Sequence, residues 1–226
     1  MEIATNYLKT AEGSALITIG NTQVLCAASV ETSVPGFLRN TGKGWVTTEY
    51  SMLPRATSTR TAREVTKGRP SGRTHEIQRL IGRSLRGVVD LSALGERSVI
   101  LDCDVLQADG GTRVASITGA YVALALAVRQ MLKYKAIPKS PLTGSVAAIS
   151  VGIVDGEAAL DLCYDEDSRA EVDANVVMTG DGRFVEYQAT AEHKVFDDVQ
   201  MARMTALAKK GIAELITLQQ AAIELA

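Results

Sequence analysis

Alternating apolar and polar residues predict a β-hairpin near the start of the chain. Two such runs, residues 15–19 and 23–30, flank a Gly-Asn-Thr turn, which is a strong hairpin signal. The pattern returns after residue 144, where two further runs meet at an Asp-Gly turn, 155–156. The likeness predicts a duplicated β unit, with helices after each copy and corresponding strands side by side around a pseudo-twofold axis.

The central stretch, residues 99–128, predicts a strand, a glycine loop and a buried helix in succession. Its apolar residues first alternate, then give way to Asp109-Gly110-Gly111, and finally form a run too apolar for an exposed helix. Two glycines let backbone N–H groups approach a ligand, and a helix starting just after Thr112-Arg113 would direct its positive end there. The loop could therefore bind an oxyanion, although proteins that bind no anion also use such turns.

Further elements follow from the same reasoning. Residues 45–50 predict a short strand, followed by a long exposed loop rich in Gly, Thr, Ser and Arg. A helix is predicted to begin at Ser71 and to be amphipathic over residues 74–89, and two strands within 174–190 turn at 180–182. A final packing helix begins near Asp197, a residue type that favours N-caps. The polar face of the amphipathic helix carries Arg79, Arg83 and Arg86.

The bulk composition is that of an ordinary soluble globular protein. The chain has 226 residues, 46% of them apolar, enough for one large α/β domain or two small lobes that share a core. Its three cysteines form no CxxC pair and lie in strand-like contexts, as reduced cysteines of a cytoplasmic protein do. The longest apolar run, residues 120–128, is far shorter than the roughly 20 residues of a membrane span, so we expect neither a membrane segment nor export.

Charge is distributed unevenly along the chain. Residues 55–86 contain eight arginines and one lysine against two glutamates, a local charge of +7, whereas the whole chain carries −2 and the remainder therefore −9. Such a segment indicates either a local polyanion site or a subunit interface that pairs with the acidic part. The basic face of the amphipathic helix is either solvated or docks on RNA or an acidic partner. Arg73, just before that helix, can meet an anion there together with free N–H groups.

A cluster of carboxylates follows the second predicted hairpin. Three explanations fit it: a solvated acidic loop, a partner for the arginines, or a metal site. Because Mg²⁺ takes one or two carboxylates and keeps several waters, Asp167 and Asp173 would suffice if the fold brings them together. The cluster consists of Asp161, Asp165, Glu166, Asp167, Glu171 and Asp173.

Other kinds of site have little support in the sequence. His75 and His193 are the only histidines, and neither has a partner at the spacing of a zinc site or a catalytic triad. The chain contains no GxxxxGKS/T motif, which argues against a P-loop NTPase. Aromatic residues make up only 4% of the chain, so any contacts to RNA would be mainly to its phosphates.

Six segments, in order and at near-constant spacing, closely resemble the bacterial ribonuclease PH family over nearly the whole chain. They read EGSALITIGNTQVLCAASVE, GKGWVTTEYSMLPRAT, SGRTHEIQRLIGRSLRGVVDL, LGERSVILDCDVLQADGGTRVASITGA, AAISVGIVDGE and EDSRAEVDANVVMTGDGRFVEYQATAE. The resemblance implies an α+β fold of duplicated βαβα lobes, ribosomal protein S5 domain 2-like, with mixed sheets packed on helices. It implies a single domain over residues 1–226.

The resemblance also implies an activity. Members of the family trim the 3′ ends of RNA, chiefly tRNA precursors, by phosphorolysis, in which inorganic phosphate replaces water as the nucleophile and nucleoside diphosphates are released. The implied cofactor is Mg²⁺ or Mn²⁺. The implied partners are RNA, inorganic phosphate and further copies of the chain in a hexameric ring, a trimer of dimers, in the cytoplasm.

The matched motifs carry residue roles with them. Phosphate-binding positions in the motifs SGRT and GGTR are matched by Arg73, Gly111, Thr112 and Arg113. Asp167, in EDS, and Asp173, in EVD, match the catalytic carboxylates, which are associated with a divalent metal and acid catalysis. The basic loop LPRATSTRTAR matches a segment linked to RNA binding and ring assembly, through Arg55, Arg60 and Arg63.

Three alternatives stay open beside this interpretation. The chain could be a non-catalytic RNA-binding ring subunit of the same fold, a small-molecule anion-binding enzyme, or a hydrolytic nuclease. The joint presence of the matched arginines and carboxylates argues against the first alternative, and the basic segment argues against the second. One departure concerns the start of the chain. Family members carry a basic segment before Met1, so either the start is misassigned or this member lacks the segment, and its loss would affect stability, oligomerisation or RNA contacts.

Overall fold

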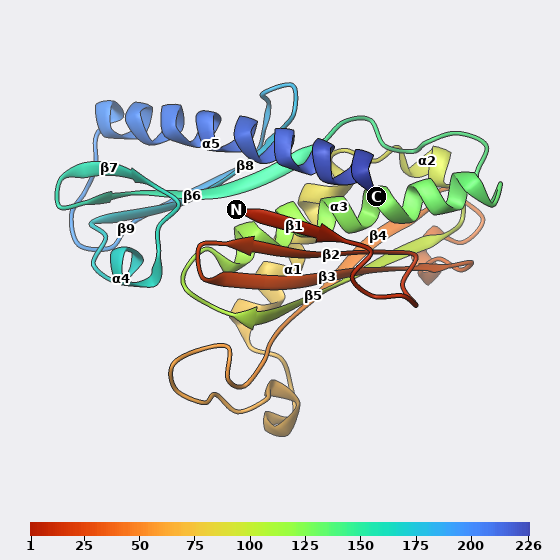
Figure 1. Ribbon diagram of the computed structural model, residues 1–226, viewed down its shortest axis with the longest axis horizontal. Helices are drawn as coiled ribbons and strands as arrows, with labels where there is room; N and C mark the ends of the chain where they lie inside the picture. The colour runs from red at the N-terminus through yellow and green to blue at the C-terminus, as the bar shows by residue number, and fades with distance from the viewer.

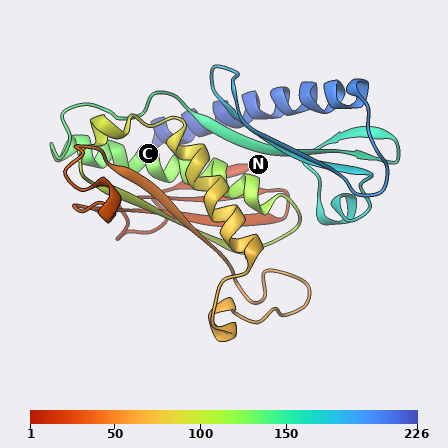
Figure 2. The same cartoon turned by 180° about the vertical axis from the view of Figure 1, so that it is seen from behind.

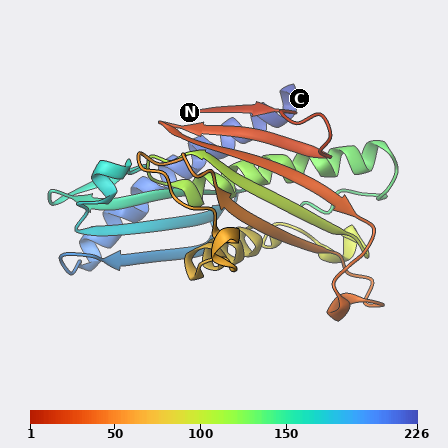
Figure 3. The same ribbon diagram turned by 90° about the horizontal axis from the view of Figure 1, so that it is seen from below.

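The computed structural model describes the backbone of residues 1–226 and the side chains of all of them except Val65 and Lys67. The first half of the chain builds a five-stranded sheet with the strand order β1-β2-β3-β5-β4 (Figure 3). Adjacent strands are antiparallel except β4 and β5, which run parallel. A parallel pair needs a crossover connection, and helix α1 (Gly72–Arg86) lies within it. The strands are β1 (Glu2–Thr5), β2 (Gly13–Ile19), β3 (Thr22–Glu31), β4 (Trp45–Met52) and β5 (Ser98–Gln107).

The second half of the chain builds a four-stranded sheet with the order β7-β6-β8-β9. All of its neighbouring strands are antiparallel. The strands are β6 (Val146–Val154), β7 (Glu157–Leu160), β8 (Val172–Thr179) and β9 (Phe184–Ala191).

Helix α3 (Thr112–Lys133) lies between the two sheets, and α5 (Asp198–Leu225) covers the far face of the second one (Figure 1). α3 packs on β2 and β3 on one side and on β6 on the other, while α5 packs on β6 and β7. With a helix on each face, β6 is buried at every position. The shorter elements are α2 (Leu91–Leu94), α4 (Tyr164–Asp167) and 3₁₀ turns at Gly36–Leu38 and Glu64–Lys67.

The apolar character of α3 follows from its central place. Its length and hydropathy would allow it to cross a membrane, but 89% of its most apolar 18-residue window is buried inside the protein. Gly119 lets this helix approach the first sheet closely, because a Cβ there would lie 2.8 Å from Cγ2 of Ile17 and 2.9 Å from Sγ of Cys26. The sheet and the beginning of α3 are therefore held in fixed relation.

The predicted hairpins, the glycine loop and the buried helix are confirmed. The final helix begins at Asp198, after Asp197, whose carboxylate accepts a hydrogen bond of 2.9 Å from the backbone N–H of Gln200. The predicted start of the amphipathic helix is confirmed, because Ser71 is its N-cap and accepts from the N–H of Thr74 at 3.2 Å, so that the first helical residue is Gly72. The helix ends at Arg86, before the predicted residue 89.

The expected pairing of the duplicated units is wrong. Corresponding hairpins, β2–β3 and β6–β7, belong to different sheets. The reason is that α3 packs on β2 and β3 of the first hairpin and on β6 of the second, and therefore lies between the two sheets.

The long loop between β4 and α1 extends away from the body of the protein (Figures 1 and 2). Its residues 58–63 are exposed, as the sequence predicted. The basic face of α1, by contrast, is not simply solvated. Arg83 forms an ion pair with Glu186 of β9, and Arg86 donates to the carbonyl of Val46 at 2.8 Å and lies 4.5 Å from the centre of the Trp45 ring.

Candidate active site

We call the half of the chain with the five-stranded sheet the first lobe and the half with the four-stranded sheet the second lobe. A cavity of about 640 Å³ is lined by residues of both lobes. The first lobe contributes the glycine loop and the start of α1, and the second contributes α4, β8 and the end of β9. Its lining includes every residue that the sequence predicted for phosphate binding and catalysis. These are Arg73, Gly111, Thr112, Arg113, Asp167 and Asp173. The fold thus brings together motifs that are widely separated in the sequence.

The glycine loop presents the N-terminus of α3 to this cavity. Gly110 and Gly111 have φ angles of 81° and 58°, a left-handed conformation that glycine adopts at little cost. The helix starts at once at Thr112, and none of the described side chains caps its N-terminus. Its first N–H groups are therefore available to an anion, and the helix dipole favours a negative charge there.

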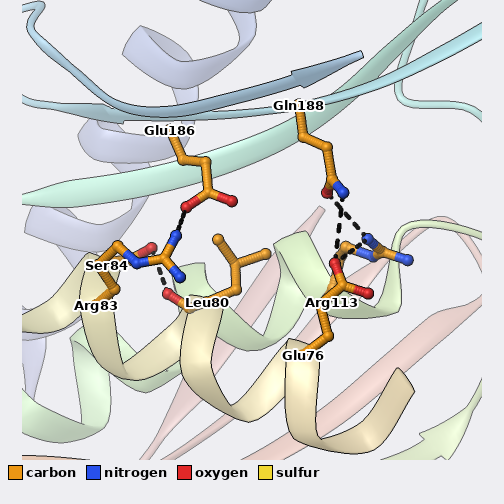
Figure 4. Close-up of polar contacts among 7 residues, drawn as sticks. All are labelled: Glu76, Leu80, Arg83, Ser84, Arg113, Glu186 and Gln188. Carbon is orange, nitrogen blue, oxygen red and sulfur yellow. Dashed lines mark hydrogen bonds and ion pairs between the residues drawn. The ribbon is translucent and has the colours of Figure 1, made fainter. Parts of the chain in front are cut away.

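Arg113 is held from two sides, by α1 and by β9 (Figure 4). Its Nη1 lies 3.4 Å from Oε1 of Glu76 and 3.3 Å from Oε1 of Gln188, and Nε2 of Gln188 donates to the same oxygen of Glu76 at 3.4 Å. Only 16% of the Arg113 side chain is exposed. These contacts engage one nitrogen of the guanidinium, so its other N–H groups remain for an anion in the cavity.

A second contact between α1 and β9 runs beside the first. Arg83 forms an ion pair with Glu186 (Figure 4). Arg83 lies two turns along α1 from Glu76, and Glu186 lies two residues along β9 from Gln188. Residues seven apart on a helix and two apart on a strand point the same way. The two contacts therefore hold one face of α1 against one face of β9, next to Arg113.

The two predicted catalytic carboxylates lie close enough to influence each other. Burial raises the pKa of Asp173, and the negative charges of Asp167 and Glu192 raise it further, while Arg113 lowers it. Burial also raises the pKa of Asp167, against the lowering effect of Arg113 and Arg73. Both arginines thus act on the same carboxylate, and the two halves of the site form one electrostatic unit.

The carboxylates fit a hard divalent cation in a simple way. Oδ1 of Asp173 is buried and has no hydrogen-bond partner in the described part of the chain, and an unpaired buried acceptor needs a partner. Among the described side chains, no group of three or more His, Cys, Asp or Glu residues is arranged to hold a metal. Mg²⁺ does not require such a group, because it takes one or two carboxylates and keeps its waters.

Several residues of this site escaped the sequence analysis. Glu76, Gln188 and Glu192 line the cavity, yet none belongs to a motif that marks it in the sequence. Tyr50 lies behind the cavity wall and shares a hydrogen bond with Thr112. His193 also lines the cavity, although its spacing in the sequence pointed to no metal or triad.

The three arginines of the basic loop are not among the cavity-lining residues. Among the side chains of the loop that the structure describes, Thr57 is the one that lines the cavity. Arg55 donates to the carbonyl of Ser58 at 3.0 Å. Burial raises the pKa of Asp104 on β5, and the charge of Arg63 lowers it. The structure therefore places the loop beside the cavity and across the edge of the first sheet.

The sequence matches known families over most of its length. Residues 1–130 match the 3′ exoribonuclease family, domain 1, and residues 144–211 match the 3′ exoribonuclease family, domain 2. Ribonuclease PH of Solibacter usitatus is 68% identical over 224 residues, which cover 99% of this chain and 94% of that protein. Ribonuclease PH of Moorella thermoacetica is 61% identical over 218 residues, covering 96% and 87% of the two chains.

Solved structures share the fold at much lower sequence identity. Rice (Oryza sativa) Rrp46 is 17% identical with a TM-score of 0.79, over 99% of this chain and 93% of that one. The Archaeoglobus fulgidus exosome, solved with RNA bound to its active site, is 22% identical with a TM-score of 0.81, over 96% and 86%. These likenesses confirm the predicted α+β fold with mixed sheets packed on helices.

Proposed function

Because the chain belongs to the ribonuclease PH family of 3′ exoribonucleases, we propose that the cavity between its lobes is the site of phosphorolysis. The chain is a phosphate-dependent 3′-to-5′ exoribonuclease, a tRNA nucleotidyltransferase that trims the 3′ ends of tRNA precursors and other RNA and releases nucleoside diphosphates. One observation carries the assignment of the site. All six residues matched to phosphate binding and catalysis line a single cavity.

The reaction places heavy electrostatic demands on its site. An oxygen of inorganic phosphate attacks the phosphorus of the last nucleotide, and the bond from that phosphorus to the 3′-oxygen of the preceding nucleotide breaks. The incoming phosphate becomes the β-phosphate of the diphosphate product, and the shortened RNA takes a proton on its new 3′-hydroxyl. Nucleophile and target are both anions, so the site must neutralise charge and align the two.

The first lobe binds the attacking phosphate. Arg73, Arg113, the hydroxyl of Thr112 and the first N–H groups of α3 converge on the cavity. Glu76 and Gln188 keep one nitrogen of Arg113 occupied, which turns the other N–H groups of that guanidinium toward phosphate. This is an anion site built from two side-chain charges and a helix N-terminus.

The second lobe acts on the scissile phosphodiester. Asp167 and Asp173 would hold Mg²⁺ or Mn²⁺, and the bound cation would neutralise the scissile phosphate and the leaving 3′-oxygen. Both carboxyl groups orient this end of the site, and acid catalysis would come from one of them in its protonated form while the other holds the cation. Support comes from the buried Oδ1 of Asp173, which has no partner among the described residues, and from burial and the charge of Asp167, which both raise the pKa of Asp173.

The basic loop completes the proposal outside the cavity. Arg55, Arg60 and Arg63 lie on a segment that extends from the body (Figures 1 and 2), where they can reach RNA upstream of the 3′ end or a neighbouring subunit. We place the enzyme in a homohexameric ring, a trimer of dimers, as the family resemblance implies. The three free cysteines support a reducing, cytoplasmic location.

Arg113→Ala tests the assignment of the site, with Arg203→Ala as the matched control. Arg203 is an exposed arginine on α5. With a 3′-extended tRNA and Mg²⁺, we expect Arg113→Ala to lower kcat/KM for phosphate by about 10²-fold or more and Arg203→Ala to leave it unchanged. Wild-type kcat/KM in a folded Arg113→Ala variant would refute the site.

A further inference from the structure

Asp109 belongs to the glycine loop, residues 109–111, which is the proposed phosphate-binding loop, and its two carboxylate oxygens contact different lobes. Nδ2 of Asn21, in the β2–β3 turn, donates to Oδ2 at 2.9 Å. The backbone N–H of Tyr164, the first residue of α4, donates to Oδ1 at 3.2 Å. The same side chain therefore contacts the first lobe with one oxygen and the helix that carries Asp167 with the other.

The backbone of the loop is fixed to the first lobe independently of this carboxylate. Oγ1 of Thr22, which is 2% exposed, donates to the carbonyl of Gly110 at 2.7 Å and accepts from the N–H of Asp109 at 2.9 Å. Both bonds survive if the Asp109 side chain is removed. The phosphate-binding loop is therefore expected to keep its shape in such a variant.

The second-lobe segment before α4 lies directly against this loop. A Cβ at Gly110 would be 2.4 Å from the carbonyl oxygen of Leu162 and 2.9 Å from the carbonyl carbon of Cys163. From the other side, Oγ of Ser150 accepts from the N–H of Leu162 at 3.0 Å. Residues 162–163 are thus confined between the two lobes, and the contact from Asp109 to Tyr164 comes immediately after them.

A displacement of Tyr164 would be passed on to Asp167. α4 is a single turn, Tyr164–Asp167, and the N–H of Asp167 donates to the carbonyl of Cys163 at 2.8 Å. The helix has only four residues, so its internal hydrogen bonds alone are too few to fix it. Its position therefore depends on outside contacts. Among the described side chains outside the helix, Asp109 is the charged one that bonds to its first turn.

We propose that Asp109 is a positioning residue that sets Asp167 relative to the phosphate-binding loop. This inference rests on the proposed function, because it takes Asp167 as a catalytic, cation-holding carboxylate. Removing the Asp109 carboxylate loosens α4 and misplaces Asp167 while the loop stays attached to Thr22. The cost therefore falls on kcat and on cation binding, and not on the affinity for phosphate.

The test compares Asp109→Ala, Asp109→Asn and Asn21→Ala. Asp109→Ala is expected to lower kcat by about 10- to 100-fold and to leave KM for phosphate within about twofold of the wild-type value. It is also expected to bind Mn²⁺ several-fold more weakly. Mn²⁺ binding is measured without RNA, from the free Mn²⁺ signal in electron paramagnetic resonance. Asp109→Asn keeps an oxygen for Tyr164, and a flipped Asn21 amide can accept from its NH₂ group, so it restores most of kcat. Asn21→Ala is expected to have a smaller effect in the same direction.

A second background separates this inference from the proposed function. In Asp167→Asn protein, Asp109→Ala should weaken Mn²⁺ binding no further, because the ligand that it positions is already altered. A purely structural role would lower Tm and leave kcat and Mn²⁺ affinity unchanged in every folded variant, which overturns the inference. If Asp109→Ala fails to fold, Asn21→Ala decides, because a lower kcat with weaker Mn²⁺ binding supports the inference and unchanged values overturn it. Wild-type kcat and Mn²⁺ affinity in Asp167→Asn itself would instead overturn the proposed function.

Discussion

The hydroxyl groups of Tyr50 and Thr112 share a buried hydrogen bond of 2.9 Å. Tyr50 is on β4 and 5% exposed, and Thr112 opens α3 and is 9% exposed. Burial raises the pKa of Tyr50, so the phenol stays protonated at neutral pH and can act in this bond as donor or acceptor. Through it, the first sheet orients the Thr112 hydroxyl at the edge of the proposed phosphate site.

Tyr50→Phe should therefore weaken phosphate binding. The variant keeps the ring and loses one hydrogen bond of about 1 kcal/mol, so we expect KM for phosphate to rise about fivefold and kcat to change less. Tyr187→Phe is the control, because its hydroxyl accepts from Thr205 at 3.4 Å, away from the cavity lining. An unchanged KM in Tyr50→Phe would contradict the role given to Thr112.

Asp173→Asn should abolish most activity while making the fold no less stable. Loss of a catalytic carboxylate typically costs about 10²- to 10⁴-fold in rate, measured as kcat at saturating phosphate. Burial and like charges raise the pKa of Asp173, so its ionised form opposes folding at neutral pH. Removing the charge is expected to raise Tm at pH 7, by no more than about 4 °C for a chain of this size.

The sign of that effect can be checked against pH. Above the raised folded-state pKa of Asp173, the group is ionised in both the folded and unfolded states, and the full penalty applies. Below the ordinary aspartate pKa it is protonated in both states, and the penalty vanishes. The Tm advantage of Asp173→Asn should therefore shrink as pH falls from 7 toward 4, and an advantage that grows in acid would contradict this account.

Gly110→Ala should be far more damaging than Gly156→Ala. The two glycines have nearly the same φ, 81° and 83°, so the left-handed conformation costs an alanine about 1–2 kcal/mol at either position. At Gly156 the added Cβ meets no described atom within 4 Å, but at Gly110 it falls 2.4 Å from the carbonyl oxygen of Leu162. We expect Gly110→Ala to lose both kcat and several more degrees of Tm, and equal Tm losses would show that the two lobes adjust freely at this contact.

The basic loop is expected to make phosphate contacts with RNA. Each contact to a single strand contributes about 0.7 to the slope of log K against log salt. Replacing Arg55, Arg60 and Arg63 together by alanine should lower the slope for a 3′-extended tRNA by up to about 2 units, compared with Arg203→Ala. The oligomer mass is measured in parallel. An unchanged slope at unchanged mass would exclude the loop from RNA binding.

The sequence predicted the elements well where local signals were strong. The hairpins and the glycine loop have alternating patterns and turn residues, and α3 has an apolar run that only a buried helix explains. The pairing of the two lobes was not predictable in this way. Periodicity shows that a strand has an apolar face, but α3 lies between the two hairpins and separates them into two sheets, which only the tertiary packing determines.

The residues of the candidate site also fall into two groups, those that the sequence could identify and those that only the tertiary structure reveals. Residues in distinctive motifs, such as Arg113 and Asp173, could be named from sequence by their resemblance to a family. Glu76, Gln188 and Tyr50 could not, because each sits in an ordinary helix or strand pattern and gains its role from a partner far away in the chain. The arginines of α1 were equally ambiguous, since the ion pair of Arg83 with Glu186 depends on how β9 packs.

The most direct test of the central claim follows the attacking phosphate into the product. Unlabelled 3′-extended tRNA is incubated with the enzyme, Mg²⁺ and ³²P-labelled inorganic phosphate, and the released nucleotides are separated and identified. Phosphorolysis predicts nucleoside diphosphates with the label in the β-phosphate, one label for each nucleotide removed, and no release without phosphate. Unlabelled nucleoside monophosphates that form equally well in phosphate-free buffer would show hydrolysis and contradict the account.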